Sequence, residues 1–213
     1  MLQSLILLRH GIRQDFEDKT WRKTASRPHD TPLSENGLKQ AHDAGRFLQK
    51  EKIDYVFASP FLRALQTADI VASYLDLPIF VEYGFMERLD PHWFESMPEI
   101  MSKEEAKARF PRIDTSYESF LFPTFPEPRH TTLTIDRIAK ALSQIHQHYD
   151  GSALVVSHGV VSIEGARALI GSEEGVLGHL CSSNKFVFED NIWQLEWATR
   201  EYLSVTEEMV RFH

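Results

Sequence analysis

Near its amino terminus the chain reads Ser4-Leu5-Ile6-Leu7-Leu8-Arg9-His10-Gly11-Ile12-Arg13, an apolar run that changes at once to charged residues. The run has the length of a buried strand, so the charged residues would lie at its carboxyl end, where open α/β sheets bind ligands. Two guanidinium groups beside an imidazole favour an anion, phosphate in particular, and imidazole is also a nucleophile near neutral pH. The alternative is a basic loop end with a surface histidine.

The composition narrows the class of protein. The 213 residues, 42% of them hydrophobic and 25% charged, suffice for one globular domain with a substantial core. The formal charge of −8 argues against a nucleic-acid partner, and the apolar start is too short for a signal peptide or a membrane span. The single cysteine, Cys181, cannot form an internal disulfide, so we expect a cytoplasmic or nuclear protein. The ten histidines form no HExxH or comparable motif, so no metal or other cofactor is expected.

The first run is followed by alternating helix and strand patterns. The expected strands and helices cover residues 4–8, 34–48, 55–58, 60–75, 78–81, 102–110, 134–149, 152–157, 160–170, 186–188 and 192–197. The stretch 14–31 lacks periodicity and is predicted as a long loop. This alternation predicts an α/β fold of three layers, in which a mostly parallel sheet carries helices on both faces. The last strand would be an edge strand that could pair with a second chain and give a homodimer.

Residues 83–130 interrupt the alternation with six prolines and many aromatic side chains. Only the stretch 102–110 resembles a helix, with Ser102 and Glu105 spaced as a capping box. We expect a small ordered cap insert, within a single domain of residues 1–213, that lies over the carboxyl edge of the sheet. Its aromatic residues either form a wall for an aryl phosphate or are the core of the insert itself. They are Phe85, Trp93, Phe94, Phe120, Phe122 and Phe125.

A second apolar run, residues 152–157, also ends in His-Gly, at His158 and Gly159. If the two strands are parallel neighbours, His10 and His158 come together, and His158 also opens a helix whose first amides favour an anion. Arg63 is expected in the first helical turn after another strand. The side chains that these strand ends would direct to one point are Arg9, His10, Arg13, Arg63 and His158.

Four blocks occur in a familiar order: Arg9-His10-Gly11, Asp30-x-Pro32-Leu33-Ser34-x-x-Gly37-x-x-Gln40-Ala41, Ser59-Pro60-x-x-Arg63-Ala64-x-Gln66-Thr67-Ala68 and Ser157-His158-Gly159. Together they resemble the histidine phosphatase superfamily, which has the phosphoglycerate mutase-like fold. The resemblance implies that His10 attacks phosphorus and forms a phosphohistidine without a metal. It also implies which side chains bind the phosphoryl oxygens, namely Arg9, Arg13, Arg63 and His158.

The resemblance further implies a proton donor in the segment after the third strand. Glu87 matches this place best and would act first as general acid and then as general base. Glu82 and Asp90 are competing candidates, and the simpler interpretation of Glu87 with Arg88 is a surface ion pair.

The branch of the superfamily is less clearly marked. Ile12 stands where mutases and fructose-2,6-bisphosphatases carry glutamate, and the Arg-His-Gly-x-Arg pattern is more similar to the suppressor-of-T-cell-signalling phosphatases and a fungal transcription-factor subunit. We therefore expect a phosphomonoesterase for a phosphorylated small molecule or a phosphotyrosine protein. The alternatives are a non-catalytic scaffold or subunit that kept the fold, and a mutase-type phosphotransferase, which Ile12 disfavours. Several residues of the long loop either border the pocket or are solvated: Trp21, Arg22, Lys23, Arg27 and His29.

Overall fold

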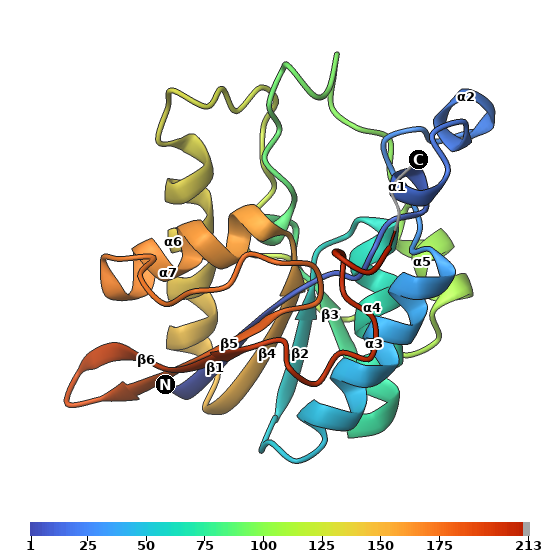
Figure 1. Ribbon diagram of the computed structural model, residues 1–213. Helices are drawn as coiled ribbons and strands as arrows, with labels where there is room; N and C mark the ends of the chain where they lie inside the picture. Colours follow the sequence, from blue (N-terminus) through green and yellow to red (C-terminus); the bar gives the residue numbers. More distant parts are fainter. Residues whose placement is uncertain (211–213) are drawn as a thin grey trace.

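The computed structural model describes residues 1–210, and its centre is a six-stranded sheet of order β3-β2-β4-β1-β5-β6 (Figure 1). The strands are β1 (Leu2–Arg9), β2 (Tyr55–Ala58), β3 (Ile79–Val81), β4 (Gly151–Ser157), β5 (Ser183–Glu189) and β6 (Ile192–Thr199). β1, β4, β2 and β3 are parallel neighbours, whereas β5 runs antiparallel to β1 and pairs with β6. The expected mostly parallel sheet with a terminal hairpin is confirmed.

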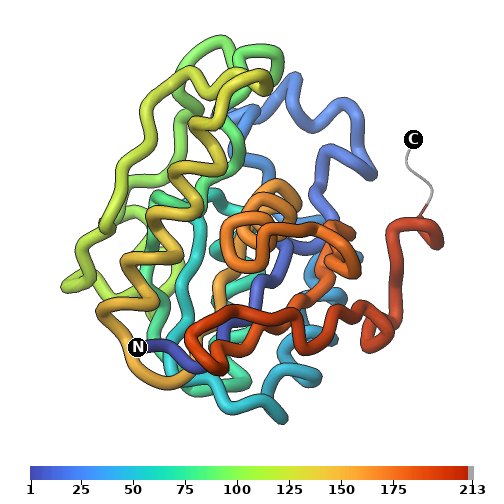
Figure 2. The backbone as a smooth tube through the Cα atoms, turned by 90° about the vertical axis from the view of Figure 1, so that its left-hand side faces the viewer, coloured from blue at the N-terminus to red at the C-terminus, as the bar shows by residue number. Residues whose placement is uncertain are grey.

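Helices cover both faces of this sheet. They are α3 (Glu35–Leu48) and α4 (Leu62–Leu75) on one face, and α6 (Leu133–His148) and α7 (Gly159–Ile170) on the other. Figure 2 shows α6 and α7 on the side of the sheet that faces the viewer. Within residues 1–210, no helix combines the length and apolarity needed to cross a membrane.

The first strand shows why its sequence is continuously apolar. Side chains alternate along a strand, so Ile6 and Leu8 join the core under α3 and α4, while Leu5 and Leu7 join the core under α6 and α7. All four are at least 98% buried. The three-layer α/β/α prediction is therefore confirmed.

Helix starts follow the predicted capping residues, with one shift. The Ser34 hydroxyl accepts from the backbone N–H of Gly37 at 3.1 Å, and Ser102 and Glu105 form the capping box of α5 (Lys103–Arg109). α4 begins at Leu62 rather than at residue 60, because the Asp30 carboxylate accepts from the Leu62 N–H at 2.7 Å and so caps the helix from another segment.

Two short helices lie in the stretch predicted as a loop. They are α1 (Gln14–Glu17) and α2 (Trp21–Thr24). The loop prediction was wrong for these residues, because a helix of a single turn is too short to show a hydrophobic period.

The insert begins with η1 (Tyr83–Phe85) and then divides into two parts. One part extends the main core at the sheet edge, where Ile113 bridges to Ile79 of β3 and Phe110 packs under α4. The other part contributes Met86, Leu89 and Phe94 to a small cluster around Phe61 of the β2–α4 connection. Their relative exposures are 0–7%.

Candidate active site

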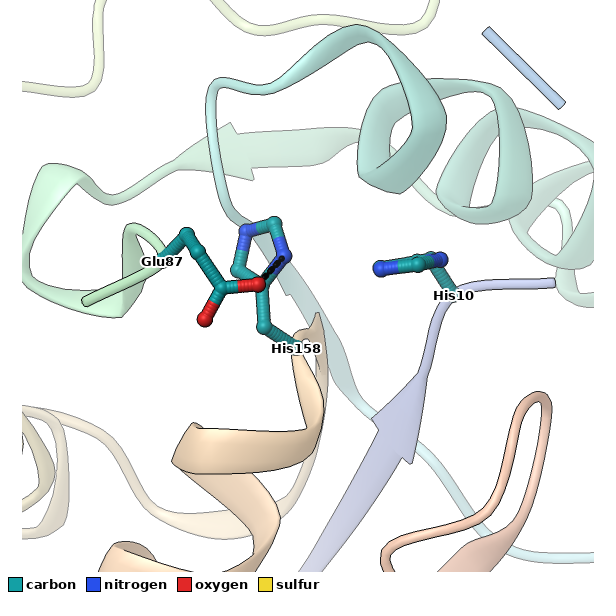
Figure 3. Close-up of side chains that lie close together, drawn as sticks. All are labelled: His10, Glu87 and His158. Carbon is teal, nitrogen blue, oxygen red and sulfur yellow. Dashed lines mark ion pairs between the residues drawn. The ribbon is translucent and has the colours of Figure 1, made fainter. Parts of the chain in front are cut away.

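The two His-Gly segments meet at the carboxyl edge of the sheet. Arg9 pairs with Ser157 at the ends of the parallel neighbours β1 and β4, so the following residues, His10 and His158, lie side by side. Their ring centroids are 5.3 Å apart, with an edge-on arrangement. Figure 3 shows the Glu87 carboxylate directed at His158, with the His10 ring on the other side of His158.

The hydrogen bonds of His10 fix its tautomer. Arg63 Nε can only donate, and it donates to His10 Nε2 at 3.1 Å, so Nε2 carries a lone pair. The proton is then on Nδ1, which donates to the carbonyl oxygen of Gly11 at 2.8 Å. Burial, and next the charge of Arg63, hold the pKa of His10 well below its usual value of 6.5. His10 is therefore a neutral imidazole with a nucleophilic nitrogen turned toward the site.

Arg63 connects the groups of the site. It lies in the first turn of α4 and is 2% exposed. Besides Nε on His10, its Nη2 lies 3.3 Å from His158 Nδ1, and its Cζ is 4.4 Å from the centre of the Phe61 ring. Burial lowers the pKa of Arg63 to about 10, so the guanidinium remains charged at neutral pH.

His158 is the N-cap residue of α7, as the strand-helix pattern predicts. Its Nε2 is 2.8 Å from the Ser59 hydroxyl, and its Nδ1 faces Arg63. Burial, and next the Arg63 charge, lower its pKa well below 6.5. A Cβ at Gly159 would lie 3.3 Å from the Arg9 guanidinium, so the glycine lets the start of α7 approach Arg9 closely.

Glu87 completes the group. Its Oε2 is 3.4 Å from His158 Nδ1 and 3.7 Å from Arg63 Nη2, and its side chain is 16% exposed. Glu87 is therefore the carboxylate that lies against both His158 and Arg63.

The backbone around Glu87 is held by a buried ion pair that the sequence did not reveal. Arg137 of α6 is paired with Glu127 at 2.6 Å and 2.7 Å. The same guanidinium donates to the carbonyl oxygens of Gly84, Met86 and Glu87. Arg137 therefore anchors the segment that carries Glu87, and no motif of the sequence indicated this.

The two competing carboxylates have other partners. Glu82 accepts from the Tyr117 hydroxyl, the Ser119 hydroxyl and the Phe120 N–H at 2.6–2.8 Å. Asp90 is bound by His92 at 2.9 Å and by Arg129, and no hydrogen bond or ion pair joins it to His10 or His158 within residues 1–210. Arg88 pairs with Glu164 at 3.0 Å and not with Glu87.

Arg9 and Arg13 differ in how they are held. Arg9 Nη1 donates to the Gly178 carbonyl oxygen at 2.6 Å, whereas its buried Nε has no hydrogen-bond partner among residues 1–210. Arg13 donates through Nε and Nη2 to both oxygens of Asp15, at 2.9 Å and 2.6 Å. The charges of Arg9 and Arg13 both lower the pKa of His10, although burial contributes most, which agrees with their lying near it.

Other motif residues fix the loop that follows His10. The side chains of Thr67 and Gln40 accept from the backbone N–H groups of Gly11 and Ile12, at 3.3 Å and 2.9 Å. A Cβ at Gly11 would lie 2.6 Å from the Gly37 carbonyl oxygen, so this loop and α3 make a contact that requires glycine. These residues belong to the family blocks, but the sequence did not indicate these contacts.

The aromatic residues of the insert do not form one wall. Phe85 is fully buried in the main core and Phe94 is nearly buried beside Phe61, while Phe122 is 67% exposed. Trp93 lies on the surface under the Arg129 guanidinium. Phe94 reaches the edge with the two histidines through Phe61, and Phe85 reaches it through its carbonyl oxygen, which accepts from the Ser157 hydroxyl.

A metal ion is the main competing interpretation of this geometry. Ligand atoms of His10, Glu87 and His158 all lie within 4.8 Å of one another, as in a site with two histidines and a carboxylate. However, Arg63 lies against the lone pairs of both histidines. A cation would have to displace a fully buried guanidinium from these nitrogens, so the arrangement suits an anion better.

Comparisons with known proteins identify the family. The family model for the histidine phosphatase superfamily (branch 1) matches residues 5–200, and the chain belongs to this superfamily. It is similar to the uncharacterized phosphatase PhoE of Bacillus subtilis (strain 168), with 31% identity over 160 residues that cover 74% of this chain and 72% of PhoE. It is also 30% identical over 210 residues to the Homo sapiens ubiquitin-associated and SH3 domain-containing protein A. This match covers 79% of this chain but only 31% of the human protein.

Solved structures show the same fold. The ecdysone phosphate phosphatase from Bombix mori, in complex with tungstate, superposes with a TM-score of 0.68 at 18% identity, covering 96% of this chain and 94% of that chain. The phosphoserine phosphatase from Entamoeba histolytica gives 0.62 at 23% identity, covering 95% and 100%. Similar proteins also include fructose-2,6-bisphosphatases and phosphoglycerate mutases, so the expected branch stays a prediction. The family and the phosphatases among its sequence relatives support a phosphatase activity for this chain.

Proposed function

We propose that the protein is a metal-independent phosphatase that hydrolyses phosphomonoesters through a phosphohistidine on His10. The observation that carries the proposal is the contact of one buried guanidinium, Arg63, with His10 Nε2 and His158 Nδ1. This arrangement offers a nucleophilic lone pair inside a positive field, which is what attack on a phosphate dianion requires.

In the first step, His10 Nε2 attacks phosphorus in line and the bond from phosphorus to the ester oxygen breaks. Glu87 gives its proton to that oxygen, so the alcohol leaves neutral. In the second step, Glu87 takes a proton from water, the hydroxide attacks phosphorus, the phosphorus–nitrogen bond breaks, and inorganic phosphate leaves. The groups that would bind the phosphoryl oxygens in both steps are Arg9, Arg13, Arg63 and His158.

The same contacts support independence from metals, because the histidine lone pairs face Arg63 and the guanidinium supplies the positive charge that a metal would otherwise provide. A mutase activity is less well supported, since Ile12 is fully buried and offers no polar group beside His10. The second candidate is a scaffold without turnover, because the human relative is a much longer protein of which this chain matches a third. The proposed partner is a phosphorylated small molecule or a phosphotyrosine protein, and the proposed location is the cytoplasm or the nucleus.

The proposal is tested by hydrolysis of para-nitrophenyl phosphate in excess EDTA. The wild type should turn over, and His10→Ala should lose activity by about 10³-fold or more, as expected when a covalent nucleophile is removed. The control is His130→Ala, because His130 is exposed and has no hydrogen bond or ion pair within the described part of the chain. Turnover that EDTA abolishes would contradict metal independence. A wild type that binds phosphate without turnover would favour the scaffold.

A further inference from the structure

A short stretch of chain, residues 30–34 (the bridging segment), connects the loop after His10 with the helix that carries Arg63. On one side, two backbone hydrogen bonds of 2.9 Å join it to the loop after His10, and Leu33 forms an antiparallel backbone bridge with the same loop. On the other side, the Leu33 N–H donates to the side-chain oxygen of Gln66 in α4 at 2.8 Å. The bridging segment therefore spans the two elements whose side chains meet at the phosphate site.

Asp30, at the start of the bridging segment, fixes the first turn of α4. Its Oδ1 accepts from the Leu62 N–H at 2.7 Å, and the residue is 3% exposed. The first N–H groups of a helix have no partner within the helix, and the N-cap residue of α4, Phe61, makes no side-chain cap. Among residues 1–210, Asp30 is thus the only side chain that accepts from the first turn of α4, and Arg63 is the next residue after Leu62.

The position of this turn decides what the Arg63 guanidinium can reach. Its Nε lies 3.1 Å from His10 Nε2, and its Nη2 lies 3.3 Å from His158 Nδ1. Both contacts are near the limit for a hydrogen bond, so a small displacement of the helix start would break them. No ion pair joins Asp30 to Arg63 within the described part of the chain. An effect of Asp30 on the site would therefore pass through the backbone of Leu62.

We propose that Asp30 is a positioning residue for the proposed reaction: by capping α4 from the bridging segment, it holds the Arg63 guanidinium on His10. This inference rests on the proposed phosphatase function. Asp30 touches none of the reacting groups, and it acts by fixing the backbone from which Arg63 extends.

The geometry favours this role over an ordinary helix cap. Ser34 and Ser102 cap α3 and α5 from the residue directly before each helix, as is usual. Asp30 instead lies 32 residues before Leu62, in the segment that is also bonded to the loop after His10. Burial of a carboxylate is costly, and Asp30 receives a single side-chain hydrogen bond among residues 1–210. A local cap would hold α4 without this cost, but it would not join α4 to the His10 loop.

The test compares three variants. Asp30→Ala removes the acceptor, whereas Asp30→Asn removes the charge and keeps a side-chain oxygen for the Leu62 N–H. Ser102→Ala is the matched control, because it removes a side-chain cap from α5, which carries none of the residues proposed to bind phosphate. The measurements are kcat for para-nitrophenyl phosphate and the pKa of His10 by NMR.

We expect Asp30→Ala to lower kcat by about 10- to 100-fold, as for a small misplacement of a catalytic group. The pKa of His10 should also move up toward 6.5, because burial and next the charge of Arg63 hold it low. Loss of the negative charge of Asp30 would by itself lower the pKa of a nearby histidine, so a rise reports a displaced Arg63. Asp30→Asn should restore both values, and Ser102→Ala should change neither.

Two results would overturn the inference. One is wild-type kcat with an unmoved His10 pKa in Asp30→Ala. The other is an Asp30→Asn variant as impaired as Asp30→Ala, since the charge and not the cap would then be the cause.

A second variant reaches the same hydrogen bond if Asp30→Ala does not fold. Leu62→Pro removes the donor and leaves Asp30 in place, and proline suits the first position of a helix. The preceding residue, Phe61, already has the extended conformation that a following proline requires, with φ −65° and ψ 137°. Lower kcat and a raised His10 pKa in Leu62→Pro would support the inference, and wild-type values of both would overturn it.

The His10 pKa separates this inference from the proposed function. If the wild type hydrolyses no phosphomonoester, the phosphatase proposal fails, but the pKa measurement needs no turnover. A His10 pKa that rises in Asp30→Ala and returns in Asp30→Asn still supports the positioning role of Asp30. An unmoved pKa in Asp30→Ala contradicts it.

Discussion

Replacing Arg63 by lysine and by glutamine separates the charge of this residue from its geometry. The guanidinium contacts both histidines and lies 3.7 Å from Glu87. An ammonium keeps the charge but cannot reach both histidines at once. Loss of one preorganised donor costs about 2.7–4 kcal/mol in the transition state, so Arg63→Lys should lower kcat by about 10²- to 10³-fold.

Glutamine should produce a different pH profile. Burial and then the charge of Arg63 hold the pKa of His10 low, and His10 must be neutral to attack phosphorus. Removing that charge raises the pKa of His10 toward 6.5, so the acidic limb of kcat/KM should move to higher pH in Arg63→Gln and stay in place in Arg63→Lys. The assay is turnover of para-nitrophenyl phosphate from about pH 4.5 to 8, with the His10 pKa followed by NMR. Arg63→Lys with more than a tenth of wild-type activity, or an unmoved limb in Arg63→Gln, would refute this reasoning.

Three further predictions concern the framework of the site. Burial raises the pKa of Asp30 to about 6, so the folded state binds a proton on this carboxyl more tightly than the unfolded chain does. The free energy of unfolding, measured with urea and compared with that of Asp30→Asn, should therefore rise by about 2 kcal/mol from pH 7 to 4.5. No rise would contradict the raised pKa. Gly37→Ala places a Cβ on the Ile12 carbonyl oxygen and should cost about 1–3 kcal/mol in the same measurement, whereas a gain in stability would show that the contact relaxes freely. Arg137→Met leaves Glu127 buried without its partner and should lower the free energy of unfolding by about 3–5 kcal/mol. The double variant Arg137→Met with Glu127→Leu should recover part of this loss.

The fold could be predicted from the sequence because its signals are local and periodic. The apolar run of β1 has no polar alternation, which is typical of a strand covered on both faces, and Ser34 marks a helix start directly. The start of α4 could not be placed in this way, since its cap, Asp30, is supplied by a segment 32 residues away. α1 and α2 were missed because each makes a single turn.

The same distinction between local signals and contacts with distant segments applies to the candidate site. The carboxyl ends of neighbouring parallel strands lie side by side at one edge of the sheet. His10 and His158 could therefore be placed together from the sequence. The sequence favoured Glu87 over Glu82 and Asp90 only through the resemblance to the family, because the contacts of the three carboxylates depend on how the insert packs. The contacts of Asp15 and Arg137 could also not be predicted, because they depend on side-chain geometry that no short motif encodes.

The most direct test of the account is to trap the covalent intermediate. The enzyme is mixed with para-nitrophenyl phosphate in excess EDTA, quenched in alkali within milliseconds, where phosphohistidine survives, and digested for mass spectrometry. The account predicts a phosphate on the imidazole of His10 in the wild type, and its accumulation in Glu87→Gln if the second step slows more than the first. Full turnover with no phosphate on His10, or with phosphate on a different residue, would contradict the account.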